Sequence, residues 1–570
     1  MKDLPRSGAA GAAQAPRSAV VPSETAAVPG TDSSGSGAFF VGAGIGLSRI
    51  VGVVRETIFA HYLGNSVPAA AFKAAIRIPN FLQNLFGEGV LSASFIPVYA
   101  ELIGKGDREE ADRLAGAVFG ILSLLTSVLA LAGALGAPLL IELIAPGFEG
   151  DARELTIRLV RILFPGVAFL VMSAWCLGIL NSHRRFFISY AAPVIWSAAQ
   201  IAVLLGSGKR TTQSRLVEYL AYGMVAGSFL QFAIQLPPVL RLLGRFRPAI
   251  SAARASVRQV FRGFAPVVLG RGVVQISAWV DVAYASLISA RAVAALSYAQ
   301  TLSLLPVSLF GMAISASELP AMSQARGSPE EIAAQLRARV NQGLARIAYF
   351  VVPSSAAFLL LGDVVAGAVF QTGKFTFSDT RYVWYLLAGS AVGLLATTSG
   401  RLYASTFYAL KDARTPLYFA GIRVLLTAAL AYLCAVRLPS ALGVPRELGG
   451  VGITATTGVA AWLEFLMLRR AAQRRIGKTG LGMKRLLSLW ASSLVAAAIA
   501  LGLKLALARQ LGVPAADAAH WEGTAFAAPS LPPILTGILV LGAYGVLYFG
   551  LTAVLHVPES AIVFRRLKPR

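Results

Sequence analysis

The chain has 570 residues, of which 56% are hydrophobic and only 14% are charged, and its mean hydropathy is +0.67. Soluble domains carry about a quarter charged residues, so this composition excludes an ordinary soluble protein and indicates a polytopic membrane protein. The net charge of +24 would suggest nucleic acid in a soluble chain. Here the basic residues lie in loops between apolar runs, where they set membrane orientation, and we expect no nucleic-acid partner.

Residues 1–37 are rich in Ala, Pro, Ser and Gly, which predicts a disordered cytoplasmic tail. Beyond them, runs of about 20 apolar residues recur to the end of the chain, each long enough to cross a bilayer. The sequence is therefore predicted to be all-α with about fourteen transmembrane helices. We place these spans near 39–63, 68–100, 114–145, 155–181, 188–206, 217–241, 260–289, 292–323, 341–361, 380–409, 415–436, 447–468, 485–508 and 532–556.

The charge of the loops predicts the orientation. Connections after even-numbered spans hold most of the Lys and Arg residues, including six arginines in 241–262 and seven basic residues in 469–485. The positive-inside rule places these loops, and therefore both termini, in the cytoplasm. The same loops are expected to contact anionic lipid headgroups.

An internal repeat divides the chain. Phe86-Gly87, followed by Ser-Ala-Ser-x-x-Pro, reappears as Phe310-Gly311 followed by the same pattern, and an apolar helix with a basic turn recurs at 179–193 and 407–420. Chance similarity between low-complexity apolar helices is the alternative explanation. The repeat predicts two six-helix lobes related by a pseudo-twofold axis along the membrane normal. We assign the N-lobe to 38–250, the C-lobe to 251–475, and a C-terminal helix pair with a basic tail to 476–570.

The first span carries Arg49, Arg55 and Glu56. A charge near the middle of a bilayer costs roughly 3 to more than 10 kcal/mol, so we expect this helix to line a wet cavity with its arginines facing an anion. The alternative is a cytoplasmic helix end whose basic side chains snorkel to the interface. Lys73 and Arg77 in the second span are four residues apart and share a helix face, which extends the candidate cluster to four cations.

A cluster of this kind predicts a phosphate-containing ligand. The planar guanidinium of arginine makes paired, charge-assisted hydrogen bonds to phosphate. Nearby carboxylates would be needed for charge balance and for release, and Glu56 and Glu88 are the candidates. For Glu88, a helix-end residue bonded to the backbone is an equally simple explanation.

The second span is interrupted by Pro79, Asn80, Gly87 and Gly89. Proline and glycine inside a span free backbone groups and allow a bend. These four residues are therefore a candidate hinge or gate, although both residue types are also common in membrane helices.

Further charges lie within apolar runs of the second half, namely Arg271, Asp281, Glu318, Arg401, Arg423 and Glu464. Each is a candidate functional residue, and each is equally explained as part of a structural salt bridge. Asp281 and Glu464 are candidates for binding a coupling cation or proton. The histidines lack metal-ligand spacing and there is no Walker lysine motif, which predicts secondary transport with no metal and no cofactor beyond an unidentified coupling ion.

Several segments together resemble one family. They are SRIVGVVRE (48–56), IPNFLQNLFGEG (78–89), APGF (145–148), GILNSHRRFFISYAAP (178–193), FQTGKF (370–375) and the FY-x-x-x-D-x-x-TP pattern (407–416). In order and spacing they resemble the MurJ/MviN family of lipid II flippases, in the multidrug/oligosaccharidyl-lipid/polysaccharide exporter superfamily. The resemblance implies a transporter rather than an enzyme, located in the bacterial inner membrane. Its substrate would be lipid II, an undecaprenyl-diphosphate-linked glycopeptide moved to the outer leaflet by alternating access for peptidoglycan synthesis.

The resemblance also implies site residues. Arg49 and Arg55 match cavity arginines of the first helix, Arg77 matches a basic position of the second, and Glu88 matches a family glutamate. The C-terminal pair would form a groove for the lipid tail.

The chain departs from the family pattern at five positions. Ala70 stands where the family has an aspartate, and Gln83 and Asn84 replace an arginine pair. Gln300 and Thr301 replace the aspartate and arginine of an A-D-R-L motif. Candidates to compensate are Lys73, Arg271 and Arg401.

Three alternative functions therefore stay open. The first is a flippase for another polyprenyl-diphosphate-linked saccharide of the exopolysaccharide or O-antigen type. The second is an ion-coupled drug exporter, which the basic cavity disfavours. The third is a scaffold that recruits cell-wall synthesis proteins through its basic loops.

Overall fold

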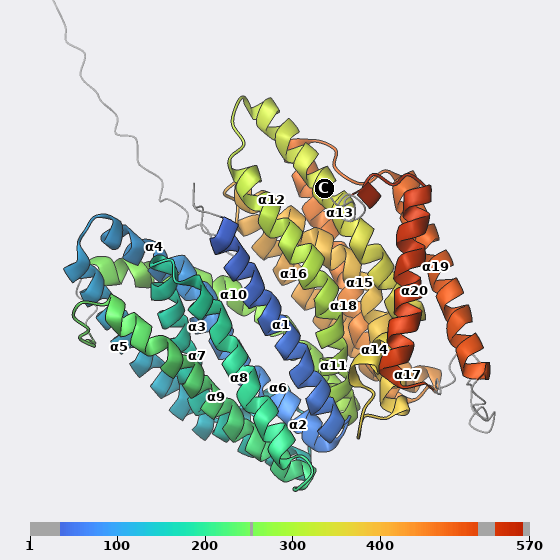
Figure 1. Cartoon of the computed structure of the whole chain (residues 1–570), viewed down its shortest axis with the longest axis horizontal. Helices are drawn as coiled ribbons and strands as arrows, with labels where there is room; N and C mark the ends of the chain where they lie inside the picture. The colour runs from blue at the N-terminus through green and yellow to red at the C-terminus, as the bar shows by residue number, and fades with distance from the viewer. Residues whose placement is uncertain (1–34, 251–254, 511–530, 562–570) are drawn as a thin grey trace, which may run out of the picture.

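The computed structural model describes residues 35–250, 255–510 and 531–561, and within these ranges every regular element is a helix (Figure 1). The all-α prediction is therefore confirmed for the described chain. Residues 1–34 of the predicted N-terminal tail and residues 562–570 of the predicted basic tail lie outside it. The tail boundary predicted at residue 37 falls inside the first helix, which begins at Gly35.

The elements follow the predicted order. The first half contains α1 (Gly35–Leu63), α2 (Val67–Ala75), α3 (Arg77–Phe86), α4 (Glu88–Gly104), α5 (Arg108–Leu135), α6 (Ala137–Ile144), α7 (Gly150–Ser182), α8 (Phe186–Ser207) and α9 (Gln213–Leu242). The second half contains α10 (Ala255–Ile288), α11 (Ala290–Pro306), the π-helical turn η1 (Val307–Met312), α12 (Ala313–Ser323), α13 (Pro329–Leu360), α14 (Gly362–Phe370), α15 (Phe377–Ala409), α16 (Arg414–Ala431), η2 (Tyr432–Arg437), α17 (Leu438–Leu442), η3 (Arg446–Leu448) and α18 (Gly449–Ile476). The C-terminal pair is α19 (Met483–Gln510) and α20 (Pro533–Val554).

Twelve segments of the described chain are long and apolar enough to cross a membrane. They correspond to the predicted spans two to six and eight to fourteen, which confirms a multi-pass membrane protein. The predicted first and seventh spans are α1 and α10, helices of 29 and 34 residues. At 1.5 Å per residue both exceed a hydrocarbon thickness of about 30 Å, but neither is among the twelve. The total of fourteen spans stays a prediction.

Each half of the chain is organised around one long buried helix. In the first half α7 packs against α2, α3, α4, α5 and α9, and in the second half α15 packs against α11, α12, α13, α14 and α18. Both helices are apolar around most of their circumference, which is the pattern of a helix surrounded by others. Figure 1 shows the blue-to-green half beside the yellow-to-orange half, with α19 and α20 at the far edge of the second.

The internal repeat is visible in backbone detail. α2 and α11 each begin with a serine cap: Ser66 and Ser289 both accept a hydrogen bond from the N–H three residues later, at 3.3 and 3.1 Å. α7 and α15 each end in a turn that places a non-glycine residue in the left-handed region, Arg184 at φ 59° and Lys411 at φ 60°. Chance similarity between apolar helices does not produce matching caps and matching turns, so two related lobes are the better explanation.

Of the four predicted interruptions of the second span, Gly87 lies at a helix break and Pro79 lies in the first turn after one, whereas Asn80 and Gly89 lie inside α3 and α4. The span is built from α2, α3 and α4, which are separated at Ile76 and at Gly87. Pro79 lies in the first turn of α3, where its missing N–H breaks the continuity with α2. The break between α3 and α4 requires glycine at position 87, because a side chain there would collide with the carbonyl of Gln83. In the second lobe the corresponding interruption is η1, which follows Pro306.

The C-terminal pair is attached to the C-lobe through a proline-freed carbonyl. Pro353 of α13 cannot donate to the carbonyl of Tyr349, four residues earlier. The hydroxyl of Tyr548 in α20 donates to this carbonyl at 2.6 Å, and that of Tyr544, one turn earlier, donates to the carbonyl of Pro353 at 2.7 Å. The bond from Tyr548 therefore replaces the one that proline removed from α13, and the bond from Tyr544 adds a second link between α20 and α13.

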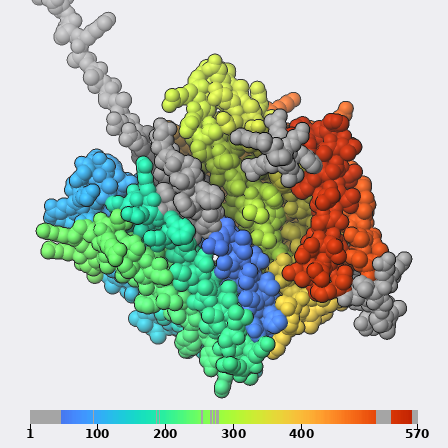
Figure 2. All heavy atoms as spheres, viewed as in Figure 1, coloured from blue at the N-terminus to red at the C-terminus, as the bar shows by residue number. Residues whose placement is uncertain are grey.

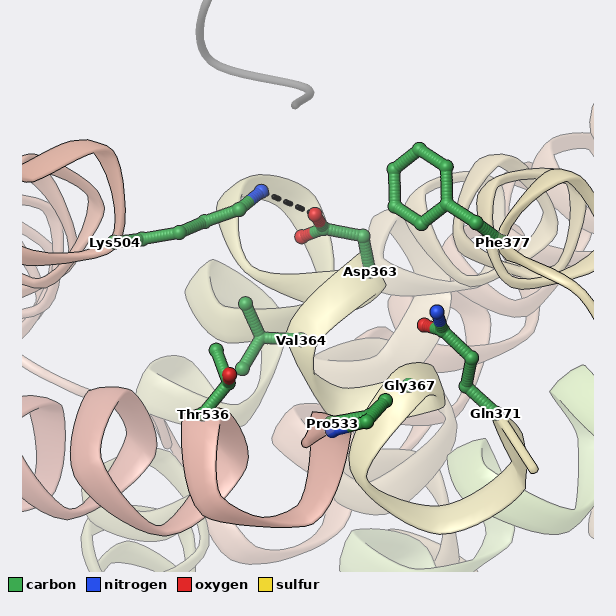
Figure 3. Close-up of a pocket in the computed structure, with 8 residues that line it drawn as sticks. All are labelled: Asp363, Val364, Gly367, Gln371, Phe377, Lys504, Pro533 and Thr536. Carbon is green, nitrogen blue, oxygen red and sulfur yellow. Dashed lines mark hydrogen bonds and ion pairs between the residues drawn. The ribbon is translucent and has the colours of Figure 1, made fainter. Parts of the chain in front are cut away.

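A buried ion pair makes a second attachment (Figure 3). Lys504 of α19 and Asp363 of α14 point toward each other and form an ion pair, and they are only 1% and 5% exposed. The small pocket around them is lined by Asp363, Val364, Gly367, Gln371, Phe377, Lys504, Pro533 and Thr536. The pair thus joins the C-terminal helices to the C-lobe at the end where α14 meets α20.

Candidate substrate-binding site

The predicted cationic cluster is assembled around a carboxylate. Glu56 of α1 accepts from Arg55, with 3.0 Å between Nη2 and Oε1, and pairs through its other oxygen with the ammonium of Lys73 in α2. The three side chains are 13%, 18% and 9% exposed respectively. Two of the four predicted cations therefore share one anion, which leaves one net positive charge in this cluster.

Aromatic rings hold both cations in place. The guanidinium carbon of Arg55 lies 4.9 Å from the ring centroid of Trp196 in α8. The ammonium of Lys73 lies 4.2 Å from the ring of Phe59 and 5.4 Å from that of Tyr298, which belongs to α11 in the other lobe. Cation–π contacts of this kind contribute about 0.5–2 kcal/mol each. Arg55 is thus fixed within the N-lobe, whereas Lys73 lies where the two lobes meet.

Arg77 is directed toward the C-lobe. Its Nη2 donates to the side-chain oxygen of Gln300 in α11, and its charge interacts with that of Asp281 in α10. Gln300 lies 223 residues after Arg77, the offset of the internal repeat. Two positions that are equivalent in the repeat therefore face each other across the boundary between the lobes.

Asp281 is buried between charges from both lobes. It accepts a hydrogen bond from Thr457 of α18 at 3.4 Å and interacts electrostatically with Arg77 and Arg423. Glu464 instead pairs with Arg423 at 3.0 Å, as the salt-bridge alternative predicts. Glu318 likewise pairs with Arg339 and Arg346, at 3.2 and 3.3 Å. Of the two residues predicted for ion coupling, Glu464 has the geometry of a structural ion pair. Asp281 stays the candidate, because it is buried and interacts with charges from both lobes.

The remaining candidates lie apart from this cluster or outside the described side chains. Arg49 is exposed on α1, six residues before Arg55. Glu88 is the first residue of α4 and Arg271 lies in α10, but the structure describes neither side chain. Arg401 is partly buried in α15. Figure 2 shows α1 in blue between the green N-lobe helices and the yellow C-lobe helices, at the surface of the molecule.

The two lobes are tied together at the end where α1 turns into α2. The hydroxyl of Tyr298 donates to the carbonyl of Gly64 at 2.7 Å, and the N–H of Lys374 donates to the carbonyl of His61 at 2.8 Å. The ring of His61 also forms a hydrogen bond with the hydroxyl of Thr372 at 2.9 Å. By the predicted orientation this is the outer end, so the structure is closed between these segments on that side.

Comparison with known proteins identifies the family. A family model described as lipid II flippase MurJ matches residues 59–514 of the chain. This chain belongs to the MurJ family. The MurJ match includes Lys73 and Arg77 but begins after Arg49, Arg55 and Glu56. MurJ proteins are named as lipid II flippases, so the chain is a membrane transporter and not an enzyme.

Individual MurJ proteins support this assignment. A probable lipid II flippase MurJ of Rhizobium meliloti is 32% identical over 435 residues, covering 75% of this chain and 78% of that protein. The lipid II flippase MurJ of Burkholderia cenocepacia is 29% identical over 436 residues, covering 75% and 82%. A solved MurJ structure, described as an inward closed conformation, superposes with a TM-score of 0.70 at 23% identity, covering 90% of this chain and 99% of that one. At that identity the superposition shows the fold alone.

The residues that hold the cations were not predicted from the sequence. Trp196, Phe59 and Tyr298 are aromatic residues in apolar runs, and nothing in the sequence singles them out. Gln300 had an available signal, because the repeat offset that relates Phe86 to Phe310 also relates Arg77 to Gln300 within one residue.

Proposed function

We propose that this chain is a lipid II flippase that moves the undecaprenyl-diphosphate-linked precursor from the inner to the outer leaflet by alternating access. The observation that carries the proposal is the cluster of Arg55, Glu56 and Lys73, with Arg77 nearby on the second span, in a protein of the MurJ family. A diphosphate needs cations in a site of low dielectric, where charge pairs are strong. Its polyprenyl tail needs an apolar surface, for which the C-terminal pair is the candidate.

In this mechanism Arg55 and Arg77 bind the diphosphate. Their guanidinium groups can each offer paired N–H donors to phosphate oxygens. Arg49 lies exposed on the same helix as Arg55, where it can meet the headgroup first. Lys73 adds a positive charge beside the site while it is paired with Glu56. Glu88 is the second candidate for charge balance.

Movement between the lobes requires the α1–α2 end to open. The joints of the second span, around Pro79, Asn80, Gly87 and Gly89, are the proposed hinge because they divide one span into three rigid helices. Opening must break the hydrogen bonds that join Gly64 and His61 to the C-lobe. A gain in substrate interaction that exceeds the free energy of these contacts can shift the equilibrium.

Ion coupling is proposed at Asp281. Its carboxylate lies between the charges of Arg77 and Arg423, so a cation or proton bound there would change the attraction between the lobes. The membrane potential can assist, because moving one charge across 100 mV is worth about 2.3 kcal/mol. Arg271 and Arg401 are the proposed compensating charges for the family arginines that Gln83, Asn84 and Thr301 replace.

We further propose an inner-membrane location with both termini in the cytoplasm. The basic loops around 241–262 and 469–485 support this orientation. The same loops would contact anionic lipids, each nearby Lys or Arg contributing about 1 kcal/mol. They also offer the surface on which cell-wall synthesis proteins could assemble.

Complementation tests the proposal. A bacterium depleted of its own lipid II flippase would express the parent chain, an Arg55→Ala plus Arg77→Ala variant, or Arg210→Ala as a control at an exposed loop position. We expect survival and outer-leaflet lipid II with the parent and the control, and loss of both with the double variant. Failure of the parent, at normal membrane levels, would favour another polyprenyl-diphosphate saccharide, and rescue by all three would exclude the two arginines from transport.

A further inference from the structure

We infer that Glu56 is an internal counter-anion: it occupies the cationic site when substrate is absent, and the substrate diphosphate displaces it from Arg55. The inference rests on the proposed function and deepens it. It turns Glu56 from a candidate for charge balance into a direct competitor of the substrate for Arg55. Glu56 precedes the segment matched by the family model.

The first support is the bridging geometry. Glu56 uses one oxygen for Arg55 and the other for Lys73, which come from α1 and α2. Both cations are largely removed from solvent, and a buried charge without a partner is strongly destabilising. Within the described chain Glu56 is the carboxylate that forms ion pairs with these two cations, so in the empty site the protein itself neutralises one of the two positive charges.

The second support is that the two contacts of Glu56 differ in kind. Arg55 is the adjacent residue on the same helix, and neighbouring residues on a helix do not naturally face each other. Its side chain must therefore turn to reach Glu56, and this contact can be exchanged. Lys73 is more deeply buried and lies over Phe59 at 4.2 Å, so its contact with Glu56 is the one expected to persist.

The third support is chemical equivalence. A carboxylate and a phosphate present the same kind of oxygen acceptor to a guanidinium, and the planar fork of Arg55 fits either. Trp196 fixes the guanidinium at 4.9 Å independently of Glu56. Arg55 can therefore exchange one anion for the other without leaving its place, while Glu56 stays paired with Lys73.

This exchange has a consequence at both ends of the cycle. On binding, the diphosphate must compete with Glu56, which lowers the affinity below what the cations alone would give. On the outer side, Glu56 competes again for Arg55 and promotes release. The empty carrier then returns with one of its two positive charges neutralised, which reduces the unpaired charge that moves through the membrane.

The test is a binding measurement on purified full-length protein in nanodiscs, with undecaprenyl diphosphate as the probe. Glu56→Gln removes the competing anion. We expect the Kd of this variant for the probe to be about tenfold lower than that of the parent, which corresponds to the free energy of about one charge-assisted hydrogen bond. Glu142→Gln is the matched control, because Glu142 is an exposed glutamate of α6, and its Kd should equal that of the parent. In reconstituted vesicles, flipping by Glu56→Gln should be slower than by the parent because release is slower.

A double-variant cycle guards against misfolding, since Glu56→Gln alone leaves Lys73 buried without its anion. Lys73→Met leaves Glu56 entirely to Arg55 and should weaken binding. Adding Glu56→Gln to Lys73→Met should then tighten it relative to Lys73→Met alone. If Glu56→Gln leaves the Kd unchanged or raises it, both in the parent and in Lys73→Met, the inference is overturned. Absence of probe binding by the folded parent would instead overturn the proposed function, and the inference with it.

Discussion

Replacing Lys504 with Met tests whether the buried ion pair holds the C-terminal helices on the C-lobe. The change keeps most of the side-chain volume but leaves Asp363, which is 5% exposed, without the ammonium. Removing one partner of a buried pair costs about 3–5 kcal/mol. We therefore expect the free energy of unfolding to fall by about 3–5 kcal/mol.

The assay is SDS-induced unfolding of the purified protein at pH 7. The control is Lys105→Met, which removes an exposed ion pair with Glu101 and should cost less than about 1 kcal/mol. Adding Asp363→Asn to Lys504→Met should recover most of the stability. If Lys504→Met and Lys105→Met lower the free energy of unfolding by the same amount, the buried ion pair does not hold the C-terminal helices on the C-lobe.

Two further predictions follow from other contacts. Tyr548→Phe removes the donor to the carbonyl of Tyr349 and should lower the free energy of unfolding by about 1–2 kcal/mol in the same assay. In a Pro353→Ala background the loss should be much smaller, because the alanine N–H can then bond to that carbonyl within the helix. Equal losses in both backgrounds would show that Tyr548 does not replace the bond that proline removes. Burial and the charge of Arg108 lower the pKa of His183, which lies in the turn after α7. The folded state therefore favours neutral His183, and stability should fall as the pH drops below about 6.5. His183→Gln should flatten this dependence between pH 7.5 and 5.5, and an unchanged slope would exclude His183 as its source.

The order and type of the helices could be predicted from the sequence because long apolar runs have one stable outcome in a bilayer. The helix breaks near Pro79 and at Gly87 could also be predicted from the sequence, because proline and glycine each affect their own backbone conformation. The repeat gave the two lobes, and the structure adds the paired serine caps and the paired left-handed turns at Arg184 and Lys411.

The partners of the charged residues were harder to predict. Helical spacing places Lys73 and Arg77 on one face but does not say which residues lie opposite, so the pairing of Lys73 with Glu56 came only with the tertiary structure. Lys504 and Asp363 are charges within or beside apolar runs, which by itself marks each of them as a candidate for a buried ion pair.

The most direct test of the central claim is lipid II flipping by the purified chain alone. Vesicles that contain fluorescent lipid II on both leaflets would be reconstituted with the parent protein, the Arg55→Ala plus Arg77→Ala variant, or no protein, and the fraction reaching an added membrane-impermeant quencher would be followed with time. The account predicts that the parent exposes the inner pool of lipid II and that the variant behaves as the protein-free vesicles do. An inner pool that stays protected with folded parent protein, with or without an imposed membrane potential, would contradict it.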